Sequence, residues 1–179
     1  MRARWLLRRF GRDRRGVAAL EFALVVPIVM VVYLVGFEVA EASTVYRKLT
    51  DTTVQLANVT AQFTSMTTSD TATILNDSSQ IMAPYPTANL AIVLSEVTTN
   101  ASGAGSVTWS QTLQGTALAK GAAVTMPTGF RTANTNYLLV QTTYSYHPTI
   151  GAAFIGPISM ANQIFMLPRS SSSIPCSGC

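Results

Sequence analysis

The chain opens with a basic segment that is followed at once by a long apolar one. The first 16 residues contain seven arginines and one aspartate, a net charge of +6. The next 21 residues, 17–37, contain one charged side chain, that of Glu21. A helix of this length extends about 32 Å and matches a hydrocarbon core about 30 Å thick. Since soluble helices are rarely apolar on all sides over such a length, we predict a membrane-spanning helix.

The distribution of charge predicts how this helix is oriented. The chain carries a net charge of +4, and residues 17–179 contribute −2 of it, from five basic and seven acidic side chains. Basic residues beside a span mark its cytoplasmic side, so the N-terminus is expected in the cytoplasm and the chain after Phe37 outside it. No nucleic-acid partner is expected, because the outer part is slightly acidic and lacks a basic stripe.

The helix is expected to continue beyond the span. Residues 38–65 contain no proline or glycine, and apolar residues recur at helical spacing, namely Val45, Leu49, Leu56, Val59 and Phe63. Pro27 lies inside the span and predicts a kink. A shorter second helix is expected to begin near Ser69 or Asp70, which are both suitable N-caps, and to end before Pro84.

After Pro86 the pattern becomes typical of strands. We predict strands at 89–98, 106–113, 136–147 and 158–167, and a short one at 122–126 within a loop. In the second of these, alternation would place four side chains on one face, those of Val107, Trp109, Gln111 and Leu113. The predicted fold class is therefore α+β, with the long helix extending into an antiparallel sheet of three to five strands whose order the sequence leaves open.

This interpretation divides the chain into five segments. They are a basic cytoplasmic leader (1–16), the transmembrane helix (17–37), a helical stem (38–85), a β-rich domain (86–168) and a C-terminal tail (169–179). The tail is rich in serine and is expected to be frayed. Its cysteines, Cys176 and Cys179, favour a local disulfide, with a bond to another chain or free thiols as alternatives. No metal site is expected, because zinc would need two more ligands and His147 is the single histidine.

No enzymatic activity and no cofactor are expected. No serine lies in a nucleophile motif, and no glycine-rich loop matches a phosphate-binding pattern. Trp109, Tyr137, Tyr144 and Tyr146 could form an aromatic binding surface. The period-two spacing of Tyr144 and Tyr146 favours cross-strand packing instead.

Three interpretations compete for the junction at Gly16. The helix could be an uncleaved anchor. It could be a secretory signal cut after Ala42, although such signals have apolar runs of about 7–15 residues. Alternatively, a cut after Gly16 would place the new ammonium of Val17 about one helical turn before Glu21. A carboxylate costs about 2.5–3.5 kcal/mol at mid-bilayer, and an amine of the same or a neighbouring chain would lower that cost.

The residues of this junction resemble a known family. The segment from Arg14 to Pro27 is similar to the start of TadE-like proteins, minor pseudopilins of the tight-adherence (Tad/Flp) branch of type IV pilus systems. The family motif is a glycine, four residues, and then a glutamate followed by an aromatic residue. The resemblance implies that a prepilin peptidase cuts between Gly16 and Val17, with Glu21 and Phe22 as residues for recognition and assembly.

The resemblance also implies a location and partners. The protein would be a single-pass protein of the bacterial cytoplasmic membrane with a periplasmic C-terminal domain, and it could enter the pilus. Its apolar helix would contact an Flp-type pilin and other pseudopilins. The rivals are an uncleaved periplasmic scaffold or binding protein and a secreted domain released after Ala42.

Overall fold

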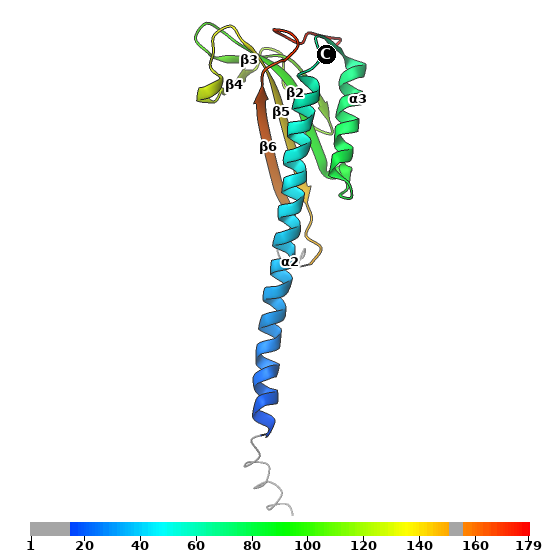
Figure 1. Cartoon of the computed structure of the whole chain (residues 1–179), viewed down its shortest axis with the longest axis vertical. Helices are drawn as coiled ribbons and strands as arrows, with labels where there is room; N and C mark the ends of the chain where they lie inside the picture. The colour runs from blue at the N-terminus through cyan, green and yellow to red at the C-terminus, as the bar shows by residue number, and fades with distance from the viewer. Residues whose placement is uncertain (1–14, 151–155) are drawn as a thin grey trace, which may run out of the picture. The chain divides into compact units, whose positions relative to one another are not determined.

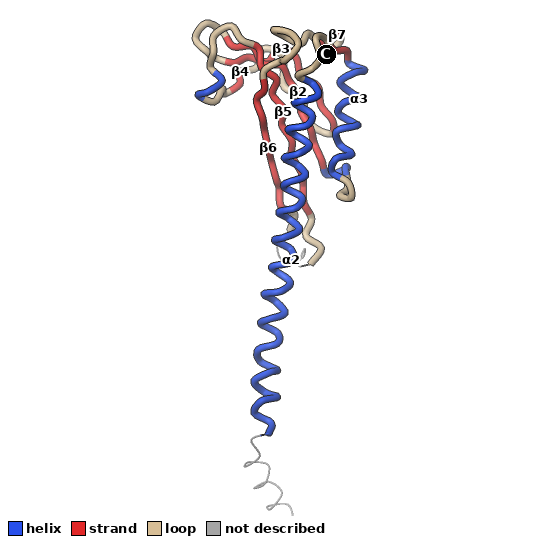
Figure 2. Tube along the Cα trace, viewed as in Figure 1, coloured by secondary structure: helices blue, strands red, loops and turns tan. Residues whose placement is uncertain are grey.

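The computed structural model describes residues 15–150 and 156–179. It confirms the predicted α+β class: a long N-terminal apolar helix packs on a five-stranded antiparallel sheet (Figure 1 and Figure 2). Residues 1–14 of the predicted leader lie outside the described residues. The long helix, α2 (Arg15–Thr60), continues through Pro27.

The chain divides into two compact units, and the boundary falls between Glu41 and Ala42 of α2. We call the second unit, Ala42–Cys179, the head. It includes the outer part of α2 and all strands among the described residues. Most of the predicted helical stem, from Ala42 to Tyr85, belongs to the same compact unit as the sheet. Its apolar side chains share one core with the strands.

The outer part of α2 packs on the sheet through a mixed apolar and threonine face. Val45, Leu49 and Leu56 are fully buried, as their spacing predicts. Val59 is 44 % exposed, so its assignment to the buried stripe was wrong. The buried face instead continues through Thr53, whose hydroxyl lies 2.6 Å from that of Thr142 on the sheet. A helix period of 3.6 residues leaves Val59 out of phase with this face.

α2 ends at Thr60, five residues earlier than expected. Ala61 N–H still makes a helical bond, to the carbonyl of Ala57 (2.9 Å). The chain then turns, because Gln62 N–H donates to the carbonyl of Val59 (3.2 Å) and Phe63 N–H donates to that of Thr60 (3.1 Å). These shorter i to i−3 bonds tighten the helix end.

A capping box starts the second helix, α3 (Thr68–Ser79). The short strand β1 (Met66–Thr67) precedes it, and Thr67 is its N-cap. Asp70 N–H donates to the Thr67 hydroxyl (3.2 Å), and Thr67 N–H donates to the Asp70 carboxylate (2.9 Å). The N-cap predicted at Ser69 or Asp70 was wrong, because Asp70 takes the third helical position of this box. The helix runs into η1 (Gln80–Met82), before Pro84 as expected.

Five strands form the main sheet in the order β4-β3-β2-β5-β6, and every neighbouring pair is antiparallel. The strands are β2 (Leu90–Thr99), β3 (Gly105–Leu113), β4 (Ala123–Val124), β5 (Asn136–Tyr146) and β6 (Ile158–Met166). Since β5 returns to pair with β2, the sheet is not a simple meander. Short 3-10 turns, η2 (Thr87–Asn89) and η3 (Thr128–Phe130), lie in the connections.

The sheet has a core on each face. Ile92, Leu94 and Val140 belong to the core shared with α2 and α3. On the other face, Phe130 covers Tyr137 and Phe165, with ring centroids 5.5 Å apart in both contacts. The four aromatic residues considered for a binding surface are each at most 5 % exposed, so they pack inside the head.

A β-bulge in β3 changes the predicted faces of that strand. Trp109 pairs with Glu96, but Val107 pairs with the next residue of β2, Val97, and Thr108 is the additional residue. Because consecutive residues of β2 point to opposite faces, Val107 and Trp109 do as well. The expectation that they share a face was therefore wrong. The bulge also sets Trp109 beside Glu96.

Candidate functional site

The predicted processing residues lie in the first turns of α2. Val17 is 50 % exposed and Phe22 is 70 % exposed, and Glu21 is exposed as well. Val17 and Glu21 are four residues apart in a continuous helix, which places them on one side of it. The structure therefore brings these two positions together, as the spacing predicts.

Gly16 has no packing role in the described structure. A Cβ atom added to it would meet nothing within 4 Å, and the same holds for Gly36 near the other end of the apolar segment. The helix itself can therefore accept alanine at both positions. Any strict need for glycine at position 16 would come from an interacting protein rather than from the fold.

The apolar segment presents its side chains outward along most of its length. Exposed large apolar residues occur almost continuously from Val17 to Val39. Among the described residues, one helix, Gly16–Thr60, is long and apolar enough to cross a membrane. Such a helix indicates a membrane anchor or a signal sequence. In either case the apolar surface needs lipid or other helices around it.

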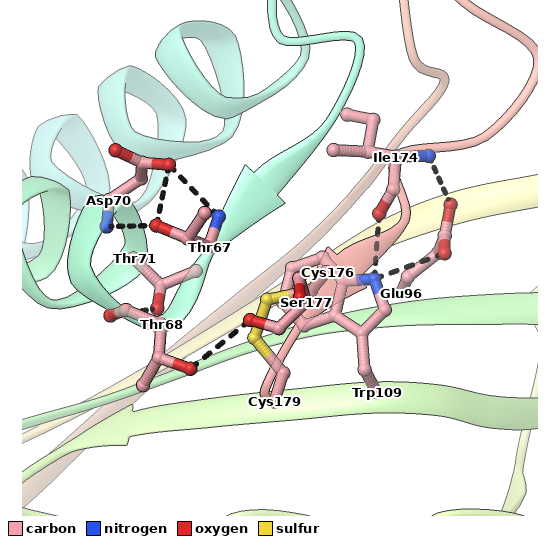
Figure 3. The surroundings of a disulfide bond; sticks show 10 residues. All are labelled: Thr67, Thr68, Asp70, Thr71, Glu96, Trp109, Ile174, Cys176, Ser177 and Cys179. Carbon is pink, nitrogen blue, oxygen red and sulfur yellow. Dashed lines mark hydrogen bonds between the residues drawn. A yellow bond between two sulfur atoms is a disulfide. The ribbon is translucent and has the colours of Figure 1, made fainter.

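A second notable group, which no motif in the sequence marks, is the buried carboxylate of Glu96 (Figure 3). The side chain is 1 % exposed. Its Oε1 accepts the backbone N–H of Ile174 (2.7 Å) and its Oε2 accepts Trp109 Nε1–H (3.1 Å). The same Trp109 Nε1–H also donates to the carbonyl oxygen of Ile174, at 2.8 Å. Both neighbouring groups are donors, so these two hydrogen bonds favour the ionised carboxylate, whereas burial favours its protonated form.

These contacts fix the C-terminal tail to the head. Ile174 is fully buried, and the tail continues into β7 (Cys176–Ser177), which pairs in parallel with β1. Arg169 contributes two more bonds: its N–H donates to the carbonyl of Ala61 (2.8 Å) and its Nη2 donates to Asn58 Oδ1 (2.8 Å). The expectation of a frayed tail was wrong, because the buried Glu96 carboxylate and the apolar core of the head hold it.

The tail ends in a disulfide between Cys176 and Cys179. Gly178 lies in the turn that the bond closes, with φ +82°. A Cβ atom there would lie 2.9 Å from Thr68 Oγ1, which donates to the carbonyl of Ser177 at 3.3 Å. A disulfide is consistent with a domain outside the cytoplasm.

One sequence signal could have identified the tail's anchor. Glu96 is the single charged residue between Asp77 and Lys120, and it interrupts an apolar strand. A carboxylate at such a position must find donors or remain unfavourably buried. The identity of the donor, a backbone amide 78 residues later in the chain, could not be predicted.

Burial raises the pKa of Glu96, and the hydrogen bonds from Ile174 and Trp109 offset part of this rise. A raised pKa means that the folded head binds this proton more tightly than the unfolded chain, whose value is near 4.5. The stability from this group is therefore fully present below pH 4.5 and is lost as the pH rises through the folded value.

Glu96→Gln should remove this component of the pH dependence. We expect the free energy of unfolding, measured in detergent from about pH 4 to 8, to fall less with rising pH in this variant than in the wild type. Asp51→Asn, at an exposed position of α2, serves as the control for loss of one carboxylate. If the free energy of unfolding of Glu96→Gln changes with pH as steeply as that of the wild type, the Glu96 carboxylate does not cause this pH dependence.

His147 is exposed, and its Nε2 lies 3.4 Å from the Ser145 hydroxyl. No third group of a catalytic triad is recorded beside this pair in the described part of the chain. Among the described residues there is also no group of three or more histidine, cysteine, aspartate or glutamate side chains that could hold a metal ion.

The arrangement of a long apolar N-terminal helix packed against an antiparallel sheet is a pilin-like architecture. Comparison with protein-family models, curated proteins and solved structures finds no match to this chain.

Proposed function

We propose that this chain is a minor pseudopilin that a prepilin peptidase cleaves after Gly16 and that acts in assembly of a tight-adherence type IV pilus. One observation carries the proposal: the exposed apolar segment of α2, residues 17–37, has its single carboxylate, Glu21, one turn after Val17, and the helix leads into a pilin-like head. The resemblance of residues 14–27 to TadE-like proteins supplies the peptidase and the pilus.

The chemistry of processing follows from the order of the residues. The arginines before Gly16 favour the cytoplasmic side of the membrane, which leaves the bond between Gly16 and Val17 at that surface. Hydrolysis of this bond removes the basic leader and creates an ammonium group on Val17. The mature chain then starts directly with its apolar helix.

Assembly would use the new ammonium group. Glu21 is the single charged side chain in the apolar segment, and its burial among other helices is unfavourable without a partner. The Val17 ammonium of a neighbouring subunit can neutralise it and form a charge-assisted hydrogen bond. Such pairing would favour one stagger between adjacent helices and leave the heads free to face the periplasm.

N-terminal sequencing of the membrane-associated protein tests the processing step. We expect Val17 as the first residue in cells with an active prepilin peptidase, and Met1 when the peptidase gene is deleted. Met1 in both strains would indicate an uncleaved anchor, and Ser43 would indicate a secreted domain.

Two matched substitutions sharpen this experiment. Gly16→Ala is expected to leave the full-length chain uncut, whereas Gly36→Ala is expected to be processed normally. Since neither added methyl group meets a neighbour in the described structure, a difference between them reports recognition by the peptidase rather than folding.

A further inference from the structure

The two edges of the main sheet differ. At one edge β4 pairs with the start of β3, and α3 lies along β3. Val107 of β3 also exchanges backbone hydrogen bonds with the loop before β4, at Ala122 (3.0 Å) and Gly121 (2.8 Å). At the other edge, β6 pairs with β5 on its inner side, and no residue in the described ranges pairs with the backbone of its outer side.

β6 lacks the features that usually protect an open edge. Its register with β5 is regular from Tyr146↔Ile158 to Leu138↔Met166, so no bulge interrupts the strand. The nine residues contain no proline and no charged side chain. Soluble proteins normally block such edges with charges, prolines, bulges or covering segments, because free N–H and C=O groups accept another strand. A long, regular and uncharged edge is suited to pairing with another β-strand when the protein functions.

A second copy of this chain is a poor fit for that edge. Asn162 of β6 donates to Thr50 of α2 (2.9 Å), and Arg169 beyond β6 contacts Asn58 further along α2, so both elements run in the same direction. Two identical edges related by a two-fold axis pair antiparallel, which would put the Ala42 ends of the two copies at opposite ends of the pair. Copies anchored in one membrane, as the proposed function requires, cannot meet in this way.

We infer that β6 accepts an extended, uncharged segment of a different extracytoplasmic protein, which adds a sixth strand to the sheet. Main-chain hydrogen bonds would supply affinity in this mode of recognition, and side-chain fit would supply specificity. The exposed side chains beside the edge, those of Ser159, Ala161 and Gln163, are small or uncharged. The segment between residues 132 and 168 contains no lysine, arginine, aspartate or glutamate, so a partner strand meets no charge to balance.

Photo-crosslinking of the full-length protein in cells of its native host tests this inference. A photoreactive amino acid at Gln163 should give a conjugate with one other protein, and mass spectrometry should place the link in an extended segment without charged residues. The same group at Gln55, exposed on α2, is the control and should give no such conjugate. A conjugate of two copies, a link to a helix or to a charged segment, or no conjugate at Gln163 would each overturn the inference.

Two lysine substitutions separate edge pairing from a general effect of charge. Ala161 and Thr143 are paired on adjacent strands and are both exposed, but Ala161 lies on the open edge. We expect Ala161→Lys to lower the yield at Gln163 by about tenfold, or about 1.4 kcal/mol, and Thr143→Lys to change it less than about twofold. Equal loss in both variants would argue against strand addition. Thermal unfolding of both variants verifies the fold. N-terminal sequencing of the same samples separates a failure of strand addition from a failure of pseudopilin processing.

Discussion

Replacing Glu21 with alanine is expected to leave cleavage after Gly16 intact and to reduce surface pili by at least about tenfold. Removing one member of a buried ion pair costs about 3–5 kcal/mol, because the remaining charge is left without its partner. Here that charge is the Val17 ammonium, which would lie among apolar helices. Each 1.4 kcal/mol corresponds to a factor of about ten in an equilibrium constant, so even a partly solvated pair would have a measurable effect.

The measurement combines N-terminal sequencing with counts of pili by electron microscopy. Glu21→Asp keeps the charge and should retain more pili than Glu21→Ala, whereas Glu21→Gln keeps the size and should behave like the alanine variant. This order separates loss of charge from loss of volume. Normal piliation in Glu21→Ala would reject the pairing with the ammonium group, and an uncut chain would show that Glu21 acts in recognition by the peptidase.

Ile174→Ala is expected to lower the free energy of unfolding of the head by about 2–5 kcal/mol, the range for large-to-small substitutions of fully buried aliphatic residues. The Ile174 side chain is fully buried. Its backbone N–H donates to the Glu96 carboxylate, and its carbonyl accepts a hydrogen bond from Trp109. Weaker packing of residue 174 would expose both the Glu96 carboxylate and the Trp109 indole to water. The effect should therefore lie above that of an exposed residue in the same tail, for which Ser177→Ala is the control.

Tryptophan fluorescence offers a direct measurement of this change. The chain has two tryptophans, and cleavage after Gly16 would remove Trp5, so Trp109 would be the single reporter in the mature protein. Chemical unfolding in detergent, followed at this indole, should show a lower midpoint for Ile174→Ala. An unchanged midpoint would contradict the assignment of Ile174 as the anchor of the tail.

The elements that the sequence predicts well are those with strong periodic patterns. The apolar helix and the strands from Leu90, Gly105, Asn136 and Ile158 appear within a few residues of their expected bounds. Hydrophobic periodicity reports burial directly, and burial is what these elements share.

The features that could not be predicted depend on contacts far apart in the chain or on polar side chains. Thr53 is buried because its hydroxyl donates to the carbonyl of Leu49 and lies beside the hydroxyl of Thr142 on the sheet. Hydrophobic periodicity does not predict this burial, since threonine is a polar residue. The bulge at Thr108 shifts the faces of β3 by one residue without any glycine or proline to mark it. The buried state of Ile174 depends on Glu96, 78 residues before it.

The processing residues show the opposite situation. The clearest motif in the sequence consists of Gly16, Val17, Glu21 and Phe22. The fold itself does not explain why these residues are present. Their side chains are exposed on α2, so packing within the fold does not account for them. Under the proposed processing, the sequence is informative because a peptidase would recognise local residues rather than a folded surface.

The distance along the chain between Glu96 and Ile174 has a consequence for biosynthesis. The core around Glu96 and Trp109 is incomplete until Ile174, 78 residues after Glu96, docks against them. The head can therefore close this core only after the chain has been synthesised through Ile174. A chain that stops before Ile174 would still contain the apolar helix, but its buried carboxylate would lack the backbone donor. Such a shortened chain is expected to be degraded more readily than one that includes Ile174.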